Sequence, residues 1–385
     1  MKSWQVNLMD KTGRVKSLDA TRGFDMFWIM GGEGLVCAIA AILGYPDFDK
    51  SFGHVPWDGL QFMDTIFPTF LFLAGVSFPF SYAKGRAHGM SDWAIVRKGF
   101  RRFVILSILG VLGALLSFKF ATMRYWSVLG RIGFAWMCAS WLYIWFGVRT
   151  RVIIAGLILV GVTLGTMLLI APDAATIIYP DSLKDIEHFG RGPFSAAGNI
   201  GCWLDRTLTG GHTYKALFDP EGFSGALPAI VTAMLGVFAG EIIRSGNGMP
   251  SGWKVLQLLA CAVFCAMSGL LLSMVCPINK ALWSPSFTLV VGGYSFALFA
   301  MFYWIIDVKD KSRWSFFFQV VGMNSITIYM AQQFVGFGQI RDFFFCGIVS
   351  LFPTGWDAVV SSCFYILTCW LFLYFLYRKN IFLKI

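Results

Sequence analysis

The chain has 385 residues, of which 57% are hydrophobic, 17% aromatic and 14% charged. A chain with so few charged residues cannot cover the surface of a soluble globular protein of this length. The composition therefore excludes a soluble globular protein and indicates a polytopic membrane protein. The formal net charge of +10 is distributed over the breaks between apolar runs and is not concentrated in a basic segment interleaved with aromatic residues, so no nucleic-acid partner is expected.

Apolar runs of membrane length follow one another through the chain. A transmembrane helix needs about 20 mostly apolar residues, and long unbroken runs favour helices over the short alternating segments of a barrel. The sequence therefore predicts an all-α polytopic membrane protein with about ten transmembrane helices. The predicted spans are 24–44, 61–83, 100–118, 126–146, 152–171, 226–243, 255–275, 285–306, 316–336 and 357–377. The segment 340–354 is too short to cross and is predicted to be re-entrant or to lie at the outer surface.

The distribution of Lys and Arg predicts that both termini are cytoplasmic. Basic residues gather in the amino-terminal segment, between the second and third spans, and at every later break that ten spans place inside. The only long break, 172–225, is then an extracytoplasmic loop, and a loop of that length usually carries function. No Asn-x-Ser/Thr sequence occurs, which favours a bacterial cytoplasmic membrane over a glycosylated compartment.

The first polar patch lies at the cytoplasmic mouth of the first span. Asp19 and Arg22 are three residues apart, a spacing that allows a local ion pair, a shared contact with an anionic ligand, or a simple positive-inside anchor. Glu33 follows deep in the same span, where a carboxylate needs a partner, so we expect it to face a polar cavity.

The second patch combines an imidazole and a carboxylate. His54 precedes the second span and Asp64 lies within it. A neutral imidazole can take a proton near neutral pH, and a carboxylate on its other nitrogen would fix the tautomer. Because Pro56 predicts a turn between them, the two side chains can meet if the chain folds back. The alternative is that His54 only caps the helix or lies at the interface.

Two arginines form the third patch. Arg124 and Arg131 are seven residues apart and share a helix face, and Arg131 is too deep to be an interfacial anchor. Arginine at such a position suits a phosphate or carboxylate ligand, or a buried ion pair with another span.

Two further segments concentrate hydrogen-bonding groups at or inside apolar spans, where they can take part in chemistry or hold helices together. They are 276–286, with Asn279, Lys280 and Trp283, and 322–325, with Asn324 and Ser325. No metal is expected, because the four histidines are scattered without metal-site spacing.

Taken together and in this order, these patches resemble the heparan-α-glucosaminide N-acetyltransferase family, in particular its bacterial branch. These are transmembrane enzymes that acetylate a terminal glucosamine with acetyl-CoA. The resemblance covers about residues 14–380. It is carried by 17–23, 54–72, 128–133, 204–206, 219–222, 235–240, 279–283 and 323–325.

The resemblance implies a single transmembrane acyltransferase domain over 1–385, with acetyl-CoA entering from the cytoplasm, an amino sugar from the opposite side, and a homodimer in the lipid bilayer. It makes His54 a general base or a nucleophile, with Asp64 as its acidic partner and Asn279 or Asn324 as the oxyanion donor. The candidate catalytic residues are His54, Asp64, Glu33, Asn279 and Asn324. The candidate cofactor-binding residues are Asp19, Arg22, Arg124, Arg131, Lys280, Trp283 and Ser325.

The chain also departs from the family pattern. Glu33 aligns with an Asn of the lysosomal enzyme, the loop from Glu33 to His54 is longer by about ten residues, and the amino-terminal lumenal domain of that enzyme has no counterpart. These departures leave the acceptor open. One alternative is an amino-sugar or cell-wall-fragment transporter or flippase, in which Glu33, Asp64 and His54 relay protons. Another is a glycan O-acetyltransferase.

Overall fold

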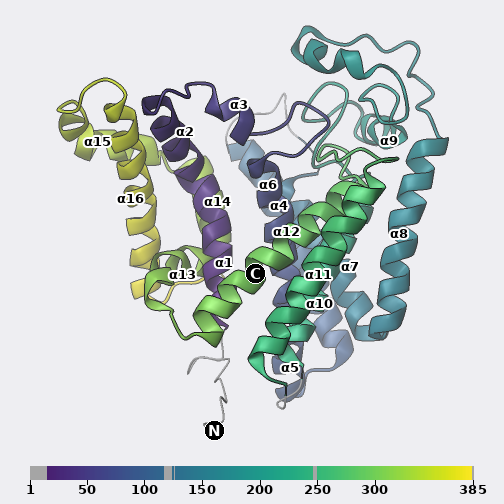
Figure 1. The fold of residues 1–385 in the computed structure, drawn as a ribbon, viewed down its shortest axis with the longest axis horizontal. Helices are drawn as coiled ribbons and strands as arrows, with labels where there is room; N and C mark the ends of the chain where they lie inside the picture. The colour runs from purple at the N-terminus through teal and green to yellow at the C-terminus, as the bar shows by residue number, and fades with distance from the viewer. Residues whose placement is uncertain (1–14, 117–123, 125, 246–248, 384–385) are drawn as a thin grey trace.

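The computed structural model describes residues 15–116, 124, 126–245 and 249–383, and in this part of the chain the regular structure is helical, with a single isolated β-bridge between Ile170 and Asn199 (Figure 1). Seven helical segments are long and apolar enough to cross a membrane, so the chain is an integral membrane protein. They are Lys16–Ile42, Phe62–Ala87, Val148–Leu168, Ala226–Arg244, Ser251–Leu272, Pro285–Val308 and Trp356–Arg378.

The other three predicted spans also fall on helices, but none of these helices is both long enough and apolar enough to be counted with the seven. They are α6 (Asp92–Leu116), α7 (Val128–Trp145), and the pair α13 (Phe316–Met323) and α14 (Ser325–Phe334), which Asn324 interrupts. Each half of that pair is far shorter than the about 20 residues that a crossing needs. The count of ten therefore stays a prediction.

The two ends of the helical bundle differ in what they carry (Figure 1). The first described residues and α5 (Phe78–Ala87) lie at the lower end, and α3 (Phe48–Phe52) and α9 (Ile200–Leu208) lie at the upper end. The long segment 172–225, with the 3₁₀ helix η4 (Asp181–Phe189), covers the upper end. The structure thus separates this loop from the basic lower end, as the predicted topology requires.

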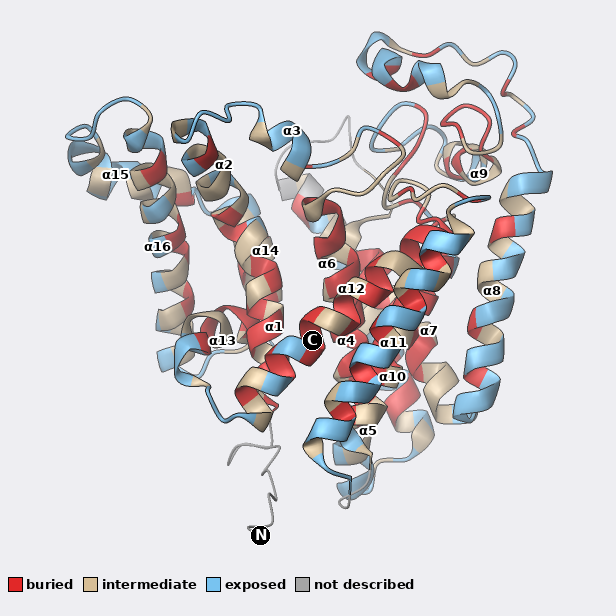
Figure 2. Cartoon of the chain, viewed as in Figure 1, coloured by how far each residue is buried: buried red, intermediate tan, exposed pale blue. Residues whose placement is uncertain are grey.

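Burial divides the helices into an inner and an outer set (Figure 2). The most apolar stretch of α10 (Ala226–Arg244) is 78% buried, whereas the corresponding stretches of α8 (Val148–Leu168) and α11 (Ser251–Leu272) are only 17% and 22% buried. The exposed residues on α8 and α11 are mostly apolar, such as Leu157 and Phe264. An apolar exposed face on a long helix is the pattern that lipid contact requires.

The first predicted span is one helical segment with a kink. It consists of α1 (Lys16–Phe27), the π-helical turn η1 (Trp28–Gly32) and α2 (Glu33–Ile42). Gly31 has a φ of 125°, a conformation that side chains disfavour. Single π turns inside helices often mark functional positions, and this one directly precedes Glu33.

Close backbone contact joins α1 to α13. A Cβ atom on Gly322 would lie 1.8 Å from the carbonyl oxygen of Asp19, and one on Gly23 would lie 1.7 Å from that of Phe318. Only glycine permits this approach, which sets Asp19 and its neighbour Arg22 beside the break at Asn324.

We expect Gly322→Ala to destabilise the protein by about 1–3 kcal/mol, because the added methyl group meets backbone that cannot move without separating the two helices. Thermal unfolding in detergent measures this. Gly165→Ala on α8 is the matched control, since a Cβ there meets no atom within 4 Å in the described part of the chain. Equal melting temperatures for the two variants would contradict the prediction.

Candidate active site

His54 and Asp64 are in contact at the upper end of the bundle. The chain folds back through a turn, so that His54 Nδ1 lies 2.7 Å from Asp64 Oδ1. Asp64 belongs to the 3₁₀ turn η2 (Phe62–Thr65), which leads into α4 (Ile66–Val76). Its second oxygen accepts hydrogen bonds from the backbone N–H of Gln61 (3.1 Å) and of Val55 (3.3 Å). The carboxylate is therefore fixed by the start of its own helix and by the residue after His54.

Lys280 completes this cluster. Its Nζ lies 3.2 Å from Asp64 Oδ1 and 3.1 Å from His54 Nδ1. A carboxylate only accepts hydrogen bonds and an ammonium only donates them, so the arrangement that satisfies Asp64 has both Nδ1–H and Lys280 donating to it. His54 then keeps a lone pair on Nε2. The Asp64 side chain is 1% exposed and that of His54 57% exposed, so the imidazole is supported from below and open above.

The loop that contains Lys280 is tied to the loop that contains His54. Asn279 is buried, donates from Nδ2 to Asp58 Oδ1 (2.9 Å), and accepts at Oδ1 from the N–H of Leu282 (2.9 Å). Gly59 N–H also donates to the carbonyl of Ile278 (2.8 Å). Asn279 thus positions its neighbour Lys280, and its amide is already used at both ends.

A cavity of about 360 Å³ opens onto His54, Asp64 and Lys280. The long loop forms its other walls, through η4 and the stretch that carries Tyr214 and Glu221. The wall residues contributed by the loop are Ser182, Leu183, Asp185, Ile186, Tyr214, Lys215, Phe218, Pro220 and Glu221. The segment 172–225 therefore forms walls of the cavity beside the imidazole, and aromatic and carboxylate side chains from it line this cavity.

Glu33 approaches the same region from below. A Cβ on Gly53 would lie 3.6 Å from Glu33 Oε1, so this carboxylate lies against the residue that precedes His54. The kink at Gly31 precedes this position.

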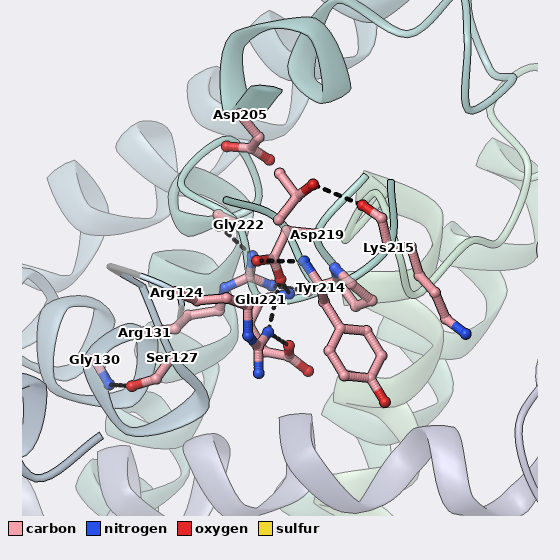
Figure 3. Close-up of polar contacts among 12 residues, drawn as sticks. Arg124, Ser127, Gly130, Arg131, Asp205, Tyr214, Lys215, Asp219, Glu221 and Gly222 are labelled. Atoms are coloured by element: carbon pink, nitrogen blue, oxygen red, sulfur yellow. Dashed lines mark hydrogen bonds and ion pairs between the residues drawn. The ribbon is translucent and has the colours of Figure 1, made fainter. Parts of the chain in front are cut away.

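Arg124 and Arg131 hold the cavity wall in place, as Figure 3 shows. Arg124 pairs with Asp219 (3.0 Å) and with Glu221, and its guanidinium lies 4.8 Å from the centre of the Tyr214 ring. Arg131 is completely buried and donates to the carbonyl of Pro220 (2.7 Å) and to that of Gly222. Both side chains thus bind the segment 219–222.

Trp283 supports Arg131 from the other side. Its ring lies 5.0 Å from the guanidinium, and its Nε1–H donates to Thr232 Oγ1 (3.2 Å). Among the predicted cofactor-binding residues, Arg124, Arg131, Lys280 and Trp283 are therefore all at the upper end.

Asp19 and Arg22 lie at the opposite end, on a second cavity of about 290 Å³. Ser77, Ser81 and Lys84 of the α4–α5 region also line it, together with Gly322 and Met323. Arg22 donates to the carbonyl of Leu73 (3.1 Å). The predicted residues Asn324 and Ser325 directly follow this wall in the chain and are buried, and Asn324 donates to the carbonyl of Ile381 (3.1 Å).

One basic residue near this lower cavity was not singled out from the sequence. Arg102 of α6 interacts repulsively with Arg22, lies 4.2 Å from the centre of the Trp136 ring, and has a buried Nε without a hydrogen-bond partner among the described residues. In the sequence, Arg102 is the last basic residue before the apolar part of α6, and this position could have identified it as a candidate.

A face of α1 connects the two ends. Asp19 and Arg22 are followed on that face by Met26 and Ile29, which line a small apolar cavity of about 40 Å³, and then by Glu33. Asp19, Arg22 and Met26 are three or four residues apart on α1 and share one face. Ile29 follows in η1, and Glu33 begins α2 after the kink at Gly31. The polar lower cavity, the apolar cavity and the region of His54 thus follow one another along α1.

These features define an integral membrane protein with a histidine–carboxylate cluster enclosed at one end and a basic cavity at the other. No protein-family model matches the chain. The heparan-alpha-glucosaminide N-acetyltransferase of Homo sapiens is 27% identical over 394 aligned positions, and that of Mus musculus is 26% identical over 398. Each alignment covers 87% of this chain and 56% of the relative, so the chain spans about half the length of these curated relatives.

This similarity agrees with the resemblance predicted from the sequence motifs: over 87% of its length, the chain is similar to heparan-alpha-glucosaminide N-acetyltransferases.

The carboxylate of Asp219 gives the cavity wall a pH dependence. Burial raises the pKa of Asp219 from its ordinary 3.8 to about 6. Arg124 opposes this shift, but its single guanidinium is shared with Glu221, whose negative charge also raises the pKa of Asp219. Between these two values the folded state holds more protons on Asp219 than the unfolded state, so the free energy of unfolding decreases as the pH rises through the interval. We expect the melting temperature of the native protein to fall relative to that of Asp219→Asn between about pH 4 and pH 6. Parallel pH profiles for the two proteins would contradict this.

Proposed function

We propose that the chain is a transmembrane N-acetyltransferase that moves the acetyl group of acetyl-CoA to the amine of a terminal glucosamine or related amino sugar. The observation that carries the proposal is the His54–Asp64 pair, 2.7 Å apart and open to an enclosed cavity. The family similarity supports the same activity. A base that faces a cavity large enough for a sugar is what amine acylation needs.

In the proposed reaction His54 acts as general base. Asp64 holds Nδ1–H, so Nε2 takes a proton from the amine as the amine attacks the thioester carbonyl. We favour this route over an acetyl-histidine intermediate, because a neutral amine is already a good nucleophile and needs only one proton removed.

The tetrahedral intermediate needs a donor for its oxyanion. Lys280 is the cationic group within 3.1 Å of the imidazole and it lines the cavity, which supports it for this role. Asn279 would have to give up its bond to Asp58, and Asn324 is bonded to Ile381 beside the lower cavity.

Acetyl-CoA is proposed to enter from the lower end, which the basic residues predict to be cytoplasmic. Arg22 and Lys84 line the lower cavity, and Arg102 interacts electrostatically with Arg22, so we propose that these three cations bind the nucleotide phosphates. From Arg22 to Glu33 the helix rises by about 16 Å. The pantetheine arm would follow this face past the apolar cavity towards His54. The bacterial cytoplasmic membrane and the homodimer remain predictions.

We expect His54→Ala to lower glucosamine-dependent release of free CoA by roughly 10²- to 10⁴-fold, because it removes the proposed general base. The measurement uses detergent-purified protein with acetyl-CoA, with and without glucosamine. His188→Ala is the control, because His188 is an exposed histidine of the same loop that stacks on Phe189 outside the cavity wall.

The other outcomes decide between the remaining functions. Unchanged CoA release in His54→Ala would remove this residue from the mechanism. Release with an alcohol acceptor but not with an amine would identify an O-acetyltransferase, and sugar uptake without CoA release would identify a transporter.

We expect Arg102→Gln to raise the KM for acetyl-CoA by about tenfold or more with a smaller effect on kcat, because a charge-assisted contact to phosphate is lost. S-acetyl-pantetheine, which lacks the nucleotide phosphates, should show the same KM with the native protein and the variant. The matched control is Arg101→Gln, at the exposed neighbouring position. An equal rise in the KM for acetyl-CoA and for S-acetyl-pantetheine would indicate a structural role for Arg102.

A further inference from the structure

A buried acid near the carboxyl end of α1 is not used by the proposed chemistry. Asp25 is 1% exposed, and its Oδ2 has no hydrogen-bond partner among the described residues. It lies in a helix that packs against both α4 and α12 (Pro285–Tyr303). An unpaired ionised carboxylate is costly in a membrane interior, so we expect Asp25 to hold a proton. Intramembrane acids of this kind are characteristic of proton pathways.

Hydroxyl groups lead from Asp25 towards the His54 cluster. The phenol of Tyr294 on α12 interacts electrostatically with Asp25 and lies near the side chain of Thr65. Thr65 directly follows Asp64, and both are buried. Two hydroxyl groups thus lie between Asp25 and the residue that holds the imidazole.

Polar groups also lead from Asp25 to the lower end. Thr21 and Ser17 lie four and eight residues before it, so they share its face of α1 at intervals of about 6 Å. The Thr21 hydroxyl donates to the Ser17 carbonyl (2.7 Å), and the Ser17 N–H lies 3.4 Å from Asp307 Oδ2. The hydroxyl oxygen of Ser17 is buried without a partner in the described part of the chain. A single water molecule can bridge two polar side chains at this spacing, and it would also give a hydrogen bond to a buried hydroxyl that lacks a protein partner.

We propose that this polar seam conducts protons between the His54–Asp64 site and the lower end of the bundle, with Asp25 as the carrier in its middle. The seam consists of Thr65, Tyr294, Asp25, Thr21, Ser17 and Asp307. The inference rests on the proposed acetyl transfer, because that reaction releases a proton. An acceptor that binds as the ammonium first gives one proton to His54, and this proton leaves along the seam. The resulting neutral amine then attacks, and its second proton ends on the CoA sulfur as the C–N bond forms and the C–S bond breaks.

The competing exit is the upper cavity, onto which the imidazole opens directly. The two exits deliver the proton to opposite sides of the membrane, so the side of release distinguishes them. Arg22 is the charged group closest to Asp25 along α1, and its contact with the Leu73 carbonyl ties it to α4. Tyr294 is the titratable neighbour on α12.

The experiment uses proteoliposomes with acetyl-CoA and a pH-sensitive dye trapped inside, and glucosamine added outside. Only molecules whose lower end faces the lumen can then turn over. We expect the lumen to acidify by one proton for each CoA released. Acidification of the external medium alone would overturn the proposal.

Two conservative variants test the seam itself. Asp25→Asn and Tyr294→Phe should abolish the lumenal proton signal, with CoA release either slowed or accompanied by external acidification, while the melting temperature stays near that of the native protein. Ser140→Ala is the control, because it removes a buried hydroxyl that bonds only to Trp136 of its own helix. An unchanged lumenal signal in Asp25→Asn would overturn the assignment of Asp25.

If the native protein releases no CoA, the acetyltransferase proposal fails and the seam is judged separately. A potassium gradient with valinomycin then drives proton uptake into the same vesicles. Uptake that Asp25→Asn abolishes and Ser140→Ala preserves would support the seam, and equal uptake by all three proteins would overturn it.

Discussion

The buried carboxylate of Asp64 is the interaction on which the candidate site depends. It accepts from two backbone N–H groups, from His54 and from Lys280, so four donors converge on a side chain that is 1% exposed. A buried carboxylate is tolerated only when its oxygens are satisfied in this way. The same bonds begin a membrane helix, orient the imidazole and anchor the loop of Lys280. Removing this carboxylate would therefore affect both chemistry and local structure.

The long loop is the second constraint, because it supplies most of the other walls of the cavity onto which the imidazole opens. Arg131 is buried and donates to backbone carbonyls of segment 219–222, and Arg124 pairs with the carboxylates of Asp219 and Glu221 in the same segment. The arginines were predicted to bind a phosphate or a carboxylate, or to form a buried ion pair. The structure shows carboxylates and carbonyls of the chain's own loop, and an anionic ligand of these arginines stays a prediction.

Local pattern was sufficient for much of the fold and for one contact of the site. Apolar runs located the helices. The turn at Pro56 allowed His54 and Asp64 to meet but left helix capping as an alternative, and the family resemblance favoured the pair. Contacts between distant segments were not predictable in this way: nothing near Arg102 in the sequence places it beside Arg22, and nothing near Lys280 places it beside Asp64. The break at Asn324 was also missed, because the runs on both sides of segment 322–325 are mostly apolar and were predicted as one continuous span.

The two ends of α1 show why one helix can serve both cavities. Its face with Arg22, Met26 and Ile29 passes from a polar cavity to an apolar one, and the kink at Gly31 precedes Glu33 beside the His54 turn. Its face with Ser17, Thr21 and Asp25 is polar and buried against α4 and α12. A helix in lipid has to bury polar side chains against protein, and each polar group placed there needs a partner or a function. In the proposed mechanism, one face would guide the elongated ligand and the other would carry protons, so the two would pass on separate sides of the helix towards His54.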